Sequence, residues 1–468
     1  MAVDFSILET IHPSRFLSFT IPNPNPTLCP SLASPLIRVA ILDSPIHPPT
    51  SASSPPVPTV AAMIVPEHRE FDWLFSTEAG HLQLLLASPN IQRLVLIGQQ
   101  PIINGYSSPS IYRRWIDSDS LNNLEMTLKP LVIALSPKSY LKNGNLEVPF
   151  LRYEDNVICS LVLEKCIGNI VGEMVVEDVE IEGANQGREF RRRLRFKRMP
   201  NLVQTEIRIV PKKVSCLDSL EIGSNSFEFI PDLGALVHVY LVPMVASLAL
   251  TGSRIEELVG AGLRPKALCL GVGGGALVGF LKTQLDFEVV GVEVDEEVLR
   301  VARKYFGLED GDLIQVCVGD GMEFLDKLAH GDVGHIDPKF DVIMVDLDSD
   351  NLRNGVSAPP LEFVRKDVLL AARSILCESG IFVVNVIPPS KSFYEILIHD
   401  FQEVFPELYE IDVGNGENFV VIAAKALPCS SSISGCENKF LQKLRLAISG
   451  AYMDNIKRIG SAMSSRSN

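Results

Sequence analysis

A glycine-rich loop directly after an apolar run restricts the fold of this chain more than any other feature. The segment ALCLGVGGGALVGFL, residues 267–281, carries Gly271, Gly273 and Gly275. Glycine permits a tight turn and a close approach of the backbone to a ligand, and a helix that starts there presents free N–H groups. The segment therefore predicts a strand, a loop and a helix that together bind a nucleotide-like ligand.

The residues after this loop alternate between apolar strands and amphipathic helices. Strands are predicted at 267–271, 288–292, 314–318, 340–345 and 381–387, and helices at about 276–285, 295–306, 321–329 and 361–376. Such alternation predicts a doubly wound parallel sheet. Two more strands, at 408–413 and 418–425, are joined by a short turn with the sequence GNGE, which predicts a terminal antiparallel hairpin.

Smaller units are predicted around this domain, because 468 residues exceed what one hydrophobic core usually spans. Residues 1–150 predict a Pro-rich segment and a small α/β region, with strands at 36–42, 93–98 and 131–136 and a helix at 77–88. Residues 151–250 predict a β-rich region, with a hairpin that turns at the sequence MPN, and a connecting helix. The ligand-binding domain is assigned to 251–428, and a linker with a C-terminal amphipathic helix to 429–468.

The charge of the chain argues against nucleic acid as its main partner. The net charge is −15, and an acidic protein attracts a basic partner and repels a phosphate backbone. Residues 188–213 hold ten Lys or Arg, but aromatic side chains for base stacking are few, so the solvated face of a hairpin is the favoured interpretation. Residues 233–253 lack charge but contain His238 and Pro243, which predicts a helix buried between two domains instead of a membrane span.

The cysteines and the first residues indicate an intracellular, cytoplasmic protein. The nine cysteines are scattered without a Cys-x-x-Cys pair, which is typical of reduced thiols, and no zinc-ligand spacing is present, so no metal site is predicted. Asp4 and Glu9 stand where a signal peptide carries basic residues. No membrane partner is expected, and a homodimer is compatible with the sequence.

Acidic residues at the ends of the predicted strands narrow the choice of ligand. Glu293 follows the second strand, 22 residues after Gly271, where a carboxylate binds ribose hydroxyls. Asp320 and Gly321 follow the third strand, where they suit an adenine amino group and the face of its ring, although Asp-Gly also forms ordinary turns. Enzymes that use NAD share the ribose feature, so these residues alone leave the nucleotide open.

The fourth strand ends in a cluster of carboxylates, Asp346, Asp348 and Asp350, in the crevice where the transferred group should lie. Hydride transfer needs no such cluster, whereas a transferase that acts on a cationic amine does. Together with the terminal hairpin, this predicts S-adenosylmethionine (AdoMet) as the cofactor. The predicted fold class is α/β, with a class I, Rossmann-like AdoMet-dependent methyltransferase domain.

Four motifs of this chain resemble those of a known family. They are ALCLGVGGGAL, VVGVEVDEEVLRVARKYFG, VGDGMEFL and FDVIMVDLDSDN followed by GVSAPPLEFV. They look like the spermidine-synthase-like branch of methyltransferases and, more closely, the C-terminal domain of the methyltransferase-like protein 13 family. Residues 61–88 and 192–206 resemble the middle region of that family, so the resemblance covers most of 36–425.

The resemblance implies an activity and a set of site residues. That family methylates translation elongation factor 1-alpha on its N-terminal amine and on a lysine. Its animal members have a separate N-terminal methyltransferase domain, credited with the lysine; this chain has one glycine nucleotide loop, so action on the N-terminal amine is implied. Carried over, Gly271, Gly273 and Gly275 flank the methionine part, Glu293 holds the ribose, Asp320 and Gly321 hold the adenine, and Asp346 and Asp348 line the acceptor site.

Two alternatives remain beside an amine methyltransferase. A polyamine aminopropyltransferase shares the fold, but it requires Asp-x-x-Asp after strand four and a Tyr-His pair before the glycine loop, where this chain has Asp346-Leu-Asp348 and VYLVPMV. A non-catalytic scaffold with the same fold is the second alternative, and the intact set of cofactor residues argues against it. A measurement of cofactor binding separates the non-catalytic scaffold from an enzyme.

The chemistry of the acceptor favours an N-terminal amine. Methyl transfer is expected as a single in-line displacement, so the protein mainly positions the acceptor. The amine must be neutral to attack, and near pH 7.4 about a quarter of an N-terminal amine is neutral, against about a thousandth of a lysine. Asp346 is expected to orient the amine and to serve as its base, and Asp348 to help attract the cation.

Overall fold

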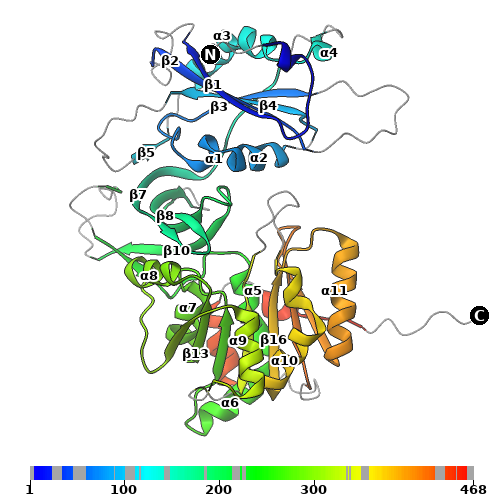
Figure 1. The fold of residues 1–468 in the computed structure, drawn as a ribbon. Coiled ribbons are helices and arrows are strands. Elements are labelled where there is room, and N and C mark those ends of the chain that lie inside the picture. Colours follow the sequence, from blue (N-terminus) through cyan, green and yellow to red (C-terminus); the bar gives the residue numbers. More distant parts are fainter. Residues whose placement is uncertain are drawn as a thin grey trace, which may run out of the picture.

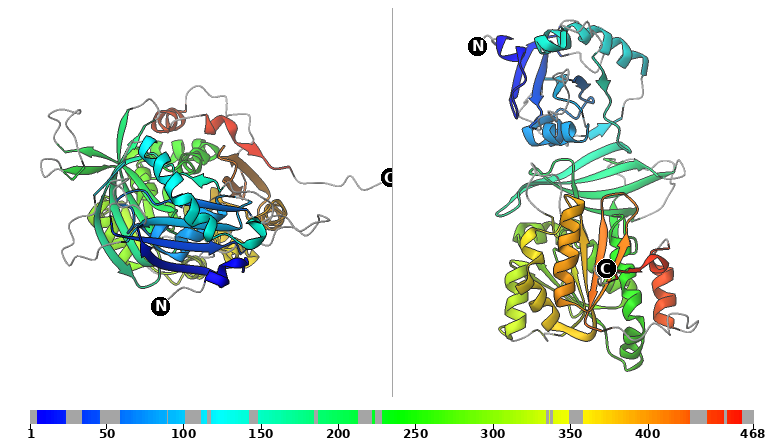
Figure 2. Two further views of the ribbon diagram at one scale, coloured as in Figure 1. Left: turned by 90° about the horizontal axis from the view of Figure 1, so that it is seen from above. Right: turned by 90° about the vertical axis from the view of Figure 1, so that its right-hand side faces the viewer.

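Three sheets are stacked along the chain, each with its own part of the core (Figure 1; Figure 2, right). They are seen in a computed structural model. It describes residues 5–23, 34–45, 59–88, 90–100, 111–114, 118–141, 148–183, 187–212, 222–223, 228–333, 336, 339–348, 358–426, 438–448 and 451–460. Asp350 and the predicted linker at 429–436 lie outside these residues.

The C-terminal sheet has eight strands in the order β14-β13-β12-β15-β16-β18-β17-β19. Their bounds are β12 Lys266–Leu270, β13 Glu288–Glu293, β14 Ile314–Val318, β15 Phe340–Val345, β16 Leu376–Val386, β17 Glu407–Asp412, β18 Phe419–Ala424 and β19 Lys457–Arg458. The five strands β12 to β16 are parallel to one another, and β18 lies antiparallel to both β16 and β17. The predicted doubly wound sheet with a terminal hairpin is confirmed. Its strand order reverses beside β12, which places a ligand crevice at the carboxyl ends of β12, β13 and β15.

Helices cover both faces of this sheet (Figure 1). Their bounds are α5 Leu241–Ala246, α6 Gly252–Gly260, α7 Ala276–Leu285, α8 Glu296–Tyr305, α9 Gly321–His330, α10 Lys366–Ile375, α11 Lys391–Val404 and α12 Lys439–Ala447, with 3-10 turns η4 Ser247–Thr251, η6 Leu361–Val364 and η8 Tyr452–Asn455. Apolar residues of α5, α7 and α12 form one core with the sheet, and those of α9, α10 and α11 form another. Burial on both faces explains why the strands are almost continuously apolar.

The uncharged segment at 233–253 is not the single helix that its composition predicts. Residues 233–240 contain turns and a bend without regular secondary structure, and α5, η4 and the start of α6 follow. Pro243 lies in the first turn of α5, where its missing N–H costs no helical hydrogen bond. All six residues of α5 are buried, so its apolar composition serves the core. No helix among the described residues has the length and hydropathy needed to cross a membrane.

The middle sheet is antiparallel, in the order β11-β10-β9-β8-β7-β5, and contains the predicted hairpin. Its strands are β5 Ile111–Arg113, β7 Val157–Gly168, β8 Gly172–Glu182, β9 Arg188–Phe196, β10 Val203–Pro211 and β11 Phe229–Asp232. The prediction that its basic residues form a solvated face holds for Arg188, Lys197 and Arg208, whose side chains are exposed, but is wrong for two arginines of β9. Arg192 and Arg195 are buried, and each pairs with a carboxylate of the neighbouring strand β8, Asp178 and Glu177 respectively. A buried cation requires such a partner, and β8 supplies one at each position.

The N-terminal sheet is mixed, in the order β1-β2-β4-β3-β6. Its elements are η1 Phe5–Glu9, β1 Phe16–Pro22, β2 Leu36–Asp43, β3 Val60–Ile64, β4 Arg93–Gln99 and β6 Phe150–Leu151, with helices α1 Trp73–Ser76, α2 Glu78–Leu86, α3 Ser118–Ala134 and α4 Lys138–Leu141. The strands at 36–42 and 93–98 and the helix at 77–88 are confirmed, but the strand at 131–136 is wrong. Those residues end α3, because Leu124, Leu128, Val132 and Leu135 recur at helical spacing on its buried face.

Candidate active site

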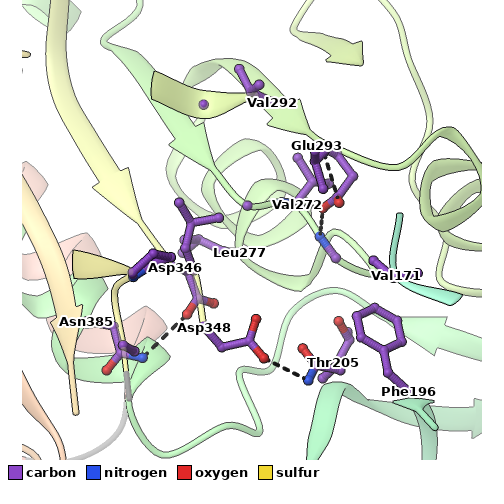
Figure 3. A pocket seen from close by; sticks show the side chains of 18 of the residues that line it. Val171, Phe196, Thr205, Val272, Leu277, Val292, Glu293, Asp346, Asp348 and Asn385 are labelled. Carbon is purple, nitrogen blue, oxygen red and sulfur yellow. Dashed lines mark hydrogen bonds between the residues drawn. The ribbon is translucent and has the colours of Figure 1, made fainter. Parts of the chain in front are cut away.

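A cavity of about 410 Å³ opens at the carboxyl ends of β12, β13, β15 and β16. The glycine loop forms one wall of the cavity. Residues of the β9–β10 hairpin, which belongs to the middle sheet, form the opposite wall (Figure 3). Glu293 and Val272 lie toward one end, and Asp346, Asp348 and Asn385 gather toward the other. The cavity is lined by apolar, polar and acidic side chains, which suits an elongated, partly polar ligand.

The glycine loop leaves no space for side chains. Gly271 has φ +85°, and a Cβ built on it would lie 2.2 Å from the carbonyl oxygen of Asp346. Gly273 and Gly275 also have positive φ, and a Cβ on Gly273 would lie 2.7 Å from the Thr205 hydroxyl. The backbone at these three positions therefore requires glycine.

The N–H groups of the loop are already used within the protein. Those of Val272 and Gly273 donate to Glu293 at 3.2 and 2.9 Å, and that of Gly274 donates to the Thr205 hydroxyl at 2.8 Å. The N–H groups of Gly271 and Gly275 donate to backbone carbonyls. A pyrophosphate needs several free N–H groups in such a loop, so this geometry favours a ligand without phosphate.

Glu293 ends β13 and is buried against the loop. Its Oε2 accepts from Val272 and Gly273, and its Oε1 accepts from the N–H groups of Val294 and Asp295 at 3.0 and 3.4 Å. Burial raises its pKa, and these four hydrogen bonds oppose that rise. The carboxylate thus holds the loop in shape from one end of the cavity.

Asp320 and Gly321 start α9 at the edge of the cavity. Oδ1 of Asp320 caps the helix by accepting from Met322 and Glu323 at 2.9 and 3.0 Å. Gly321 lies beneath the ring of Phe363, which a Cβ would meet at 3.5 Å. Both positions line the cavity, together with the buried Phe363. An exposed acid and an aromatic face suit the polar edge and the flat face of an adenine ring.

Asp346 directly follows β15 and is held by two polar side chains from other parts of the chain. Its Oδ2 accepts from the Tyr240 hydroxyl at 3.2 Å, and its Oδ1 accepts from Asn385 Nδ2 at 3.4 Å. Burial raises the pKa of Asp346 to about 7, with the neighbouring Asp348 adding to the rise and the two hydrogen bonds opposing it. A carboxyl group that titrates near neutral pH can accept a proton and release it again.

Asp348 lies two residues after Asp346 and contacts the β9–β10 hairpin. Its Oδ2 accepts from Gln204 Nε2 at 3.1 Å, and its Oδ1 lies 3.8 Å from the Arg198 guanidinium. The acidic pair is thus shared between the α/β domain and the β9–β10 hairpin. The third acidic residue of the sequence cluster, Asp350, lies outside the described residues.

Several residues of this site are missed by sequence analysis. Tyr240, Asn385, Thr205, Gln204 and Arg198 all line the cavity. Asn385 does leave a signal, because it is the one polar residue in the apolar run IFVVNVI, at the carboxyl end of a predicted strand. The three hairpin residues leave none, since only the packing of the middle sheet brings them to the loop.

One argument against polyamine chemistry is weaker in the structure than in the sequence. The segment VYLVPMV lacks a Tyr-His pair, yet Tyr240 binds Asp346 and His238 lines the same cavity. The rings of these two residues are 5.4 Å apart. Burial lowers the pKa of His238, which keeps its ring neutral. The spacing of Asp346 and Asp348 remains as the departure from the aminopropyltransferase pattern.

Comparisons with known proteins match this chain to a synthase-domain family model and to named methyltransferases. A family model described as "Spermine/spermidine synthase domain" matches residues 264–396. The eEF1A lysine and N-terminal methyltransferase homolog of Drosophila pseudoobscura pseudoobscura is 29% identical over 399 residues, which are 84% of this chain and 52% of that protein. The eEF1A lysine and N-terminal methyltransferase of Homo sapiens is 28% identical over 390 residues, 80% of this chain and 51% of that protein.

This chain spans about half the length of the curated relatives it matches. Among solved structures, human methyltransferase-like protein 13 in complex with SAH shares 27% identity and covers 45% of this chain and 92% of its own, with a TM-score of 0.39. The resemblance that the motifs carry is confirmed: the chain is similar to the eEF1A lysine and N-terminal methyltransferases.

Proposed function

We propose that this chain is an AdoMet-dependent methyltransferase that acts on a protein amine, most directly the N-terminal amine of translation elongation factor 1-alpha. The observation that carries the proposal is the cavity itself. At one end lies a glycine loop whose N–H groups donate within the protein and leave little for a phosphate. At the other end lies Asp346, whose pKa is raised to about 7. Scattered cysteines, with no disulfide among the described residues, suit a reducing compartment, and we place the activity in the cytoplasm.

The residues of the cavity fit AdoMet in three places. Gly271, Gly273 and Gly275 allow the tight, positive-φ backbone of the loop, along which the methionine part lies. Glu293 accepts the ribose hydroxyls, which replace its two longest hydrogen bonds, those from Val272 and Asp295. Asp320 and Gly321 take the adenine, with the ring of Phe363 beside them. When bound, AdoMet supplies a methyl group already activated by its sulfonium charge.

The side chains at the acceptor end orient the amine and accept its proton. Asp346 orients the amine through its Oδ atoms, and Tyr240 and Asn385 fix the direction of that carboxylate. The amine lone pair forms the new N–C bond as the C–S bond breaks, and the amine proton passes to Asp346. Because Asp346 is partly protonated near pH 7, it opposes deprotonation of the amine less than a fully charged carboxylate would.

The identity of the acceptor is supported by the relatives. Their names state a lysine and an N-terminal methyltransferase activity on eEF1A. This chain carries −15 net charge and two described carboxylates at the acceptor end, which attract a basic, flexible N-terminus. The fraction of neutral amine at physiological pH favours the N-terminus over lysine.

A polyamine aminopropyltransferase is the second candidate, because the matching family model carries the name of spermine and spermidine synthases. Calorimetry with AdoMet and with decarboxylated AdoMet separates the two functions. The proposal expects AdoMet to bind at least as tightly as its decarboxylated form. Much tighter binding of the decarboxylated form would replace amine methylation with aminopropyl transfer.

Replacing Glu293 tests the cofactor end. Glu293→Gln keeps the size of the side chain but places an NH2 group against backbone N–H donors, so we expect AdoMet to bind at least about tenfold more weakly. Glu296→Gln, on the exposed start of α8, removes the same charge outside the cavity and should leave affinity unchanged. Equal affinity for all three proteins would refute the role of Glu293.

A further inference from the structure

The acceptor end of the cavity already contains a cation of the protein itself. Arg198 lies between β9 and β10, and its guanidinium is 3.8 Å from Oδ1 of Asp348. The two side chains are 26% and 25% exposed, so the pair is neither fully solvated nor sealed. Arginine keeps its charge at any physiological pH and therefore resembles a protonated amine in what it offers a carboxylate.

Each partner of this ion pair has a further contact within the hairpin. The guanidinium lies 5.2 Å from the centre of the Phe196 ring, at cation–π distance. Gln204, from the start of β10, donates to the other oxygen of Asp348. The hairpin thus presents one cation and one amide donor to Asp348, one of the two carboxylates that the proposed function uses to attract the incoming amine.

We propose that Arg198 is a built-in competitor of the acceptor, a specificity residue that occupies Asp348 until a cationic N-terminus displaces it. This inference rests on the proposed function and extends it to recognition of the substrate. An amine that enters the cavity must replace the guanidinium beside Asp348, so amines with low affinity for the site are excluded. A protein N-terminus with further basic residues supplies the additional attraction to the acidic chain that the exchange requires.

Loss of the competitor should strengthen binding of the acceptor. Binding of a peptide with the first residues of mature elongation factor 1-alpha is measured by calorimetry, with S-adenosylhomocysteine present. We expect Arg198→Ala to tighten it by about three- to tenfold, because one like charge leaves a partly solvated acidic site. The same peptide with an acetylated N-terminus should bind the variant and the parent protein equally.

Matched variants separate this effect from general changes. Arg198→Gln removes the charge but keeps a side chain over Phe196, so it repeats the test if the alanine variant folds poorly. Arg198→Lys restores a cation and should return affinity to that of the parent protein. Arg208→Ala removes an equal charge from an exposed pair with Asp232, outside the cavity, and should change affinity by less than about twofold.

Three outcomes would overturn the inference, and a fourth would overturn only the proposed function. Unchanged or weaker binding of the free peptide by both neutral variants would show that Arg198 does not compete. Weaker binding of S-adenosylhomocysteine would place Arg198 on the cofactor instead. Absence of binding by every protein would reject the acceptor site together with the inference. Tighter binding without any methyl transfer would keep the competitor and reject the proposed function.

Discussion

Asp346→Asn is expected to reduce methyl transfer by at least about a thousandfold while AdoMet still binds. The amide keeps the size of the side chain but cannot take the amine proton or attract its charge. Loss of a general base alone costs about a hundred- to ten-thousandfold. In the parent protein, the rate should fall as pH drops below about 7, because Asp346 becomes protonated there. Initial rates between pH 6 and 9, with parallel calorimetry for AdoMet, measure both effects.

The same variant should make the protein more stable at alkaline pH. The pKa of Asp346 rises from 3.8 in the unfolded chain to about 7 in the folded one, so the folded state binds the proton more tightly and stability falls as pH rises between these values. A shift of about three units corresponds to about 4 kcal/mol, from which about 1 kcal/mol is deducted for the lost hydrogen bond of Asn385.

Urea unfolding at pH 5 and pH 8 tests this expectation. Asp346→Asn should gain on the order of 3 kcal/mol over the parent protein at pH 8, and clearly less at pH 5. A variant that is less stable at pH 8 would show that the charged carboxylate costs nothing in the folded protein. A fully active variant would remove Asp346 from the mechanism.

Arg195→Met should cost about 3–5 kcal/mol of stability, because it leaves the buried Glu177 without its cation and Asp72 with only one of its two, Arg69. The guanidinium of Arg195 contacts Glu177 at 2.8 Å on β8 and Asp72 at 3.1 Å, which caps α1 of the N-terminal region. Burial alone would raise the pKa of Asp72, but Arg195 and Arg69 hold it below its usual range. That contribution is present above the unfolded pKa of about 4 and is lost as pH falls further.

A matched control lies on the neighbouring strand β10. Arg208 pairs with Asp232, and these side chains are 50% and 22% exposed, so Arg208→Met should cost less than about 1 kcal/mol. Urea unfolding of both variants at pH 7 compares them, and the first transition is the relevant one because Arg195 joins the middle sheet to the N-terminal region. Equal stability of the two variants would contradict the assigned burial of Arg195.

Sequence periodicity was sufficient to predict the α/β domain because its strands and helices carry local patterns. The end of α3 was mistaken for a strand because a run such as LVIALS suits either structure until the spacing of earlier leucines is considered. The local pattern predicts solvated arginines on β9, whereas two of them are buried because their partners Asp178 and Glu177 lie on a different strand. Pairing between strands is set by register, which a local pattern does not contain.

The candidate site divides in the same way. The sequence positions of Gly271, Glu293, Asp320 and Asp346 follow from the rule that ligands bind at the carboxyl ends of parallel strands. Tyr240 and Asn385 were missed because their importance lies in contact with Asp346, which appears only when the elements pack together. Use of the loop N–H groups by Glu293 and Thr205 is likewise visible only in three dimensions.

The most direct test of the central claim is the position of the transferred methyl group. The full chain is incubated with labelled AdoMet and elongation factor 1-alpha without its initiator methionine, and the product is mapped by mass spectrometry. The account predicts methyl groups on the first residue, and none with Asp346→Asn. Label confined to internal lysines would contradict the assigned amine, and transfer of an aminopropyl group from decarboxylated AdoMet to a polyamine, with no label on protein, would contradict the function itself.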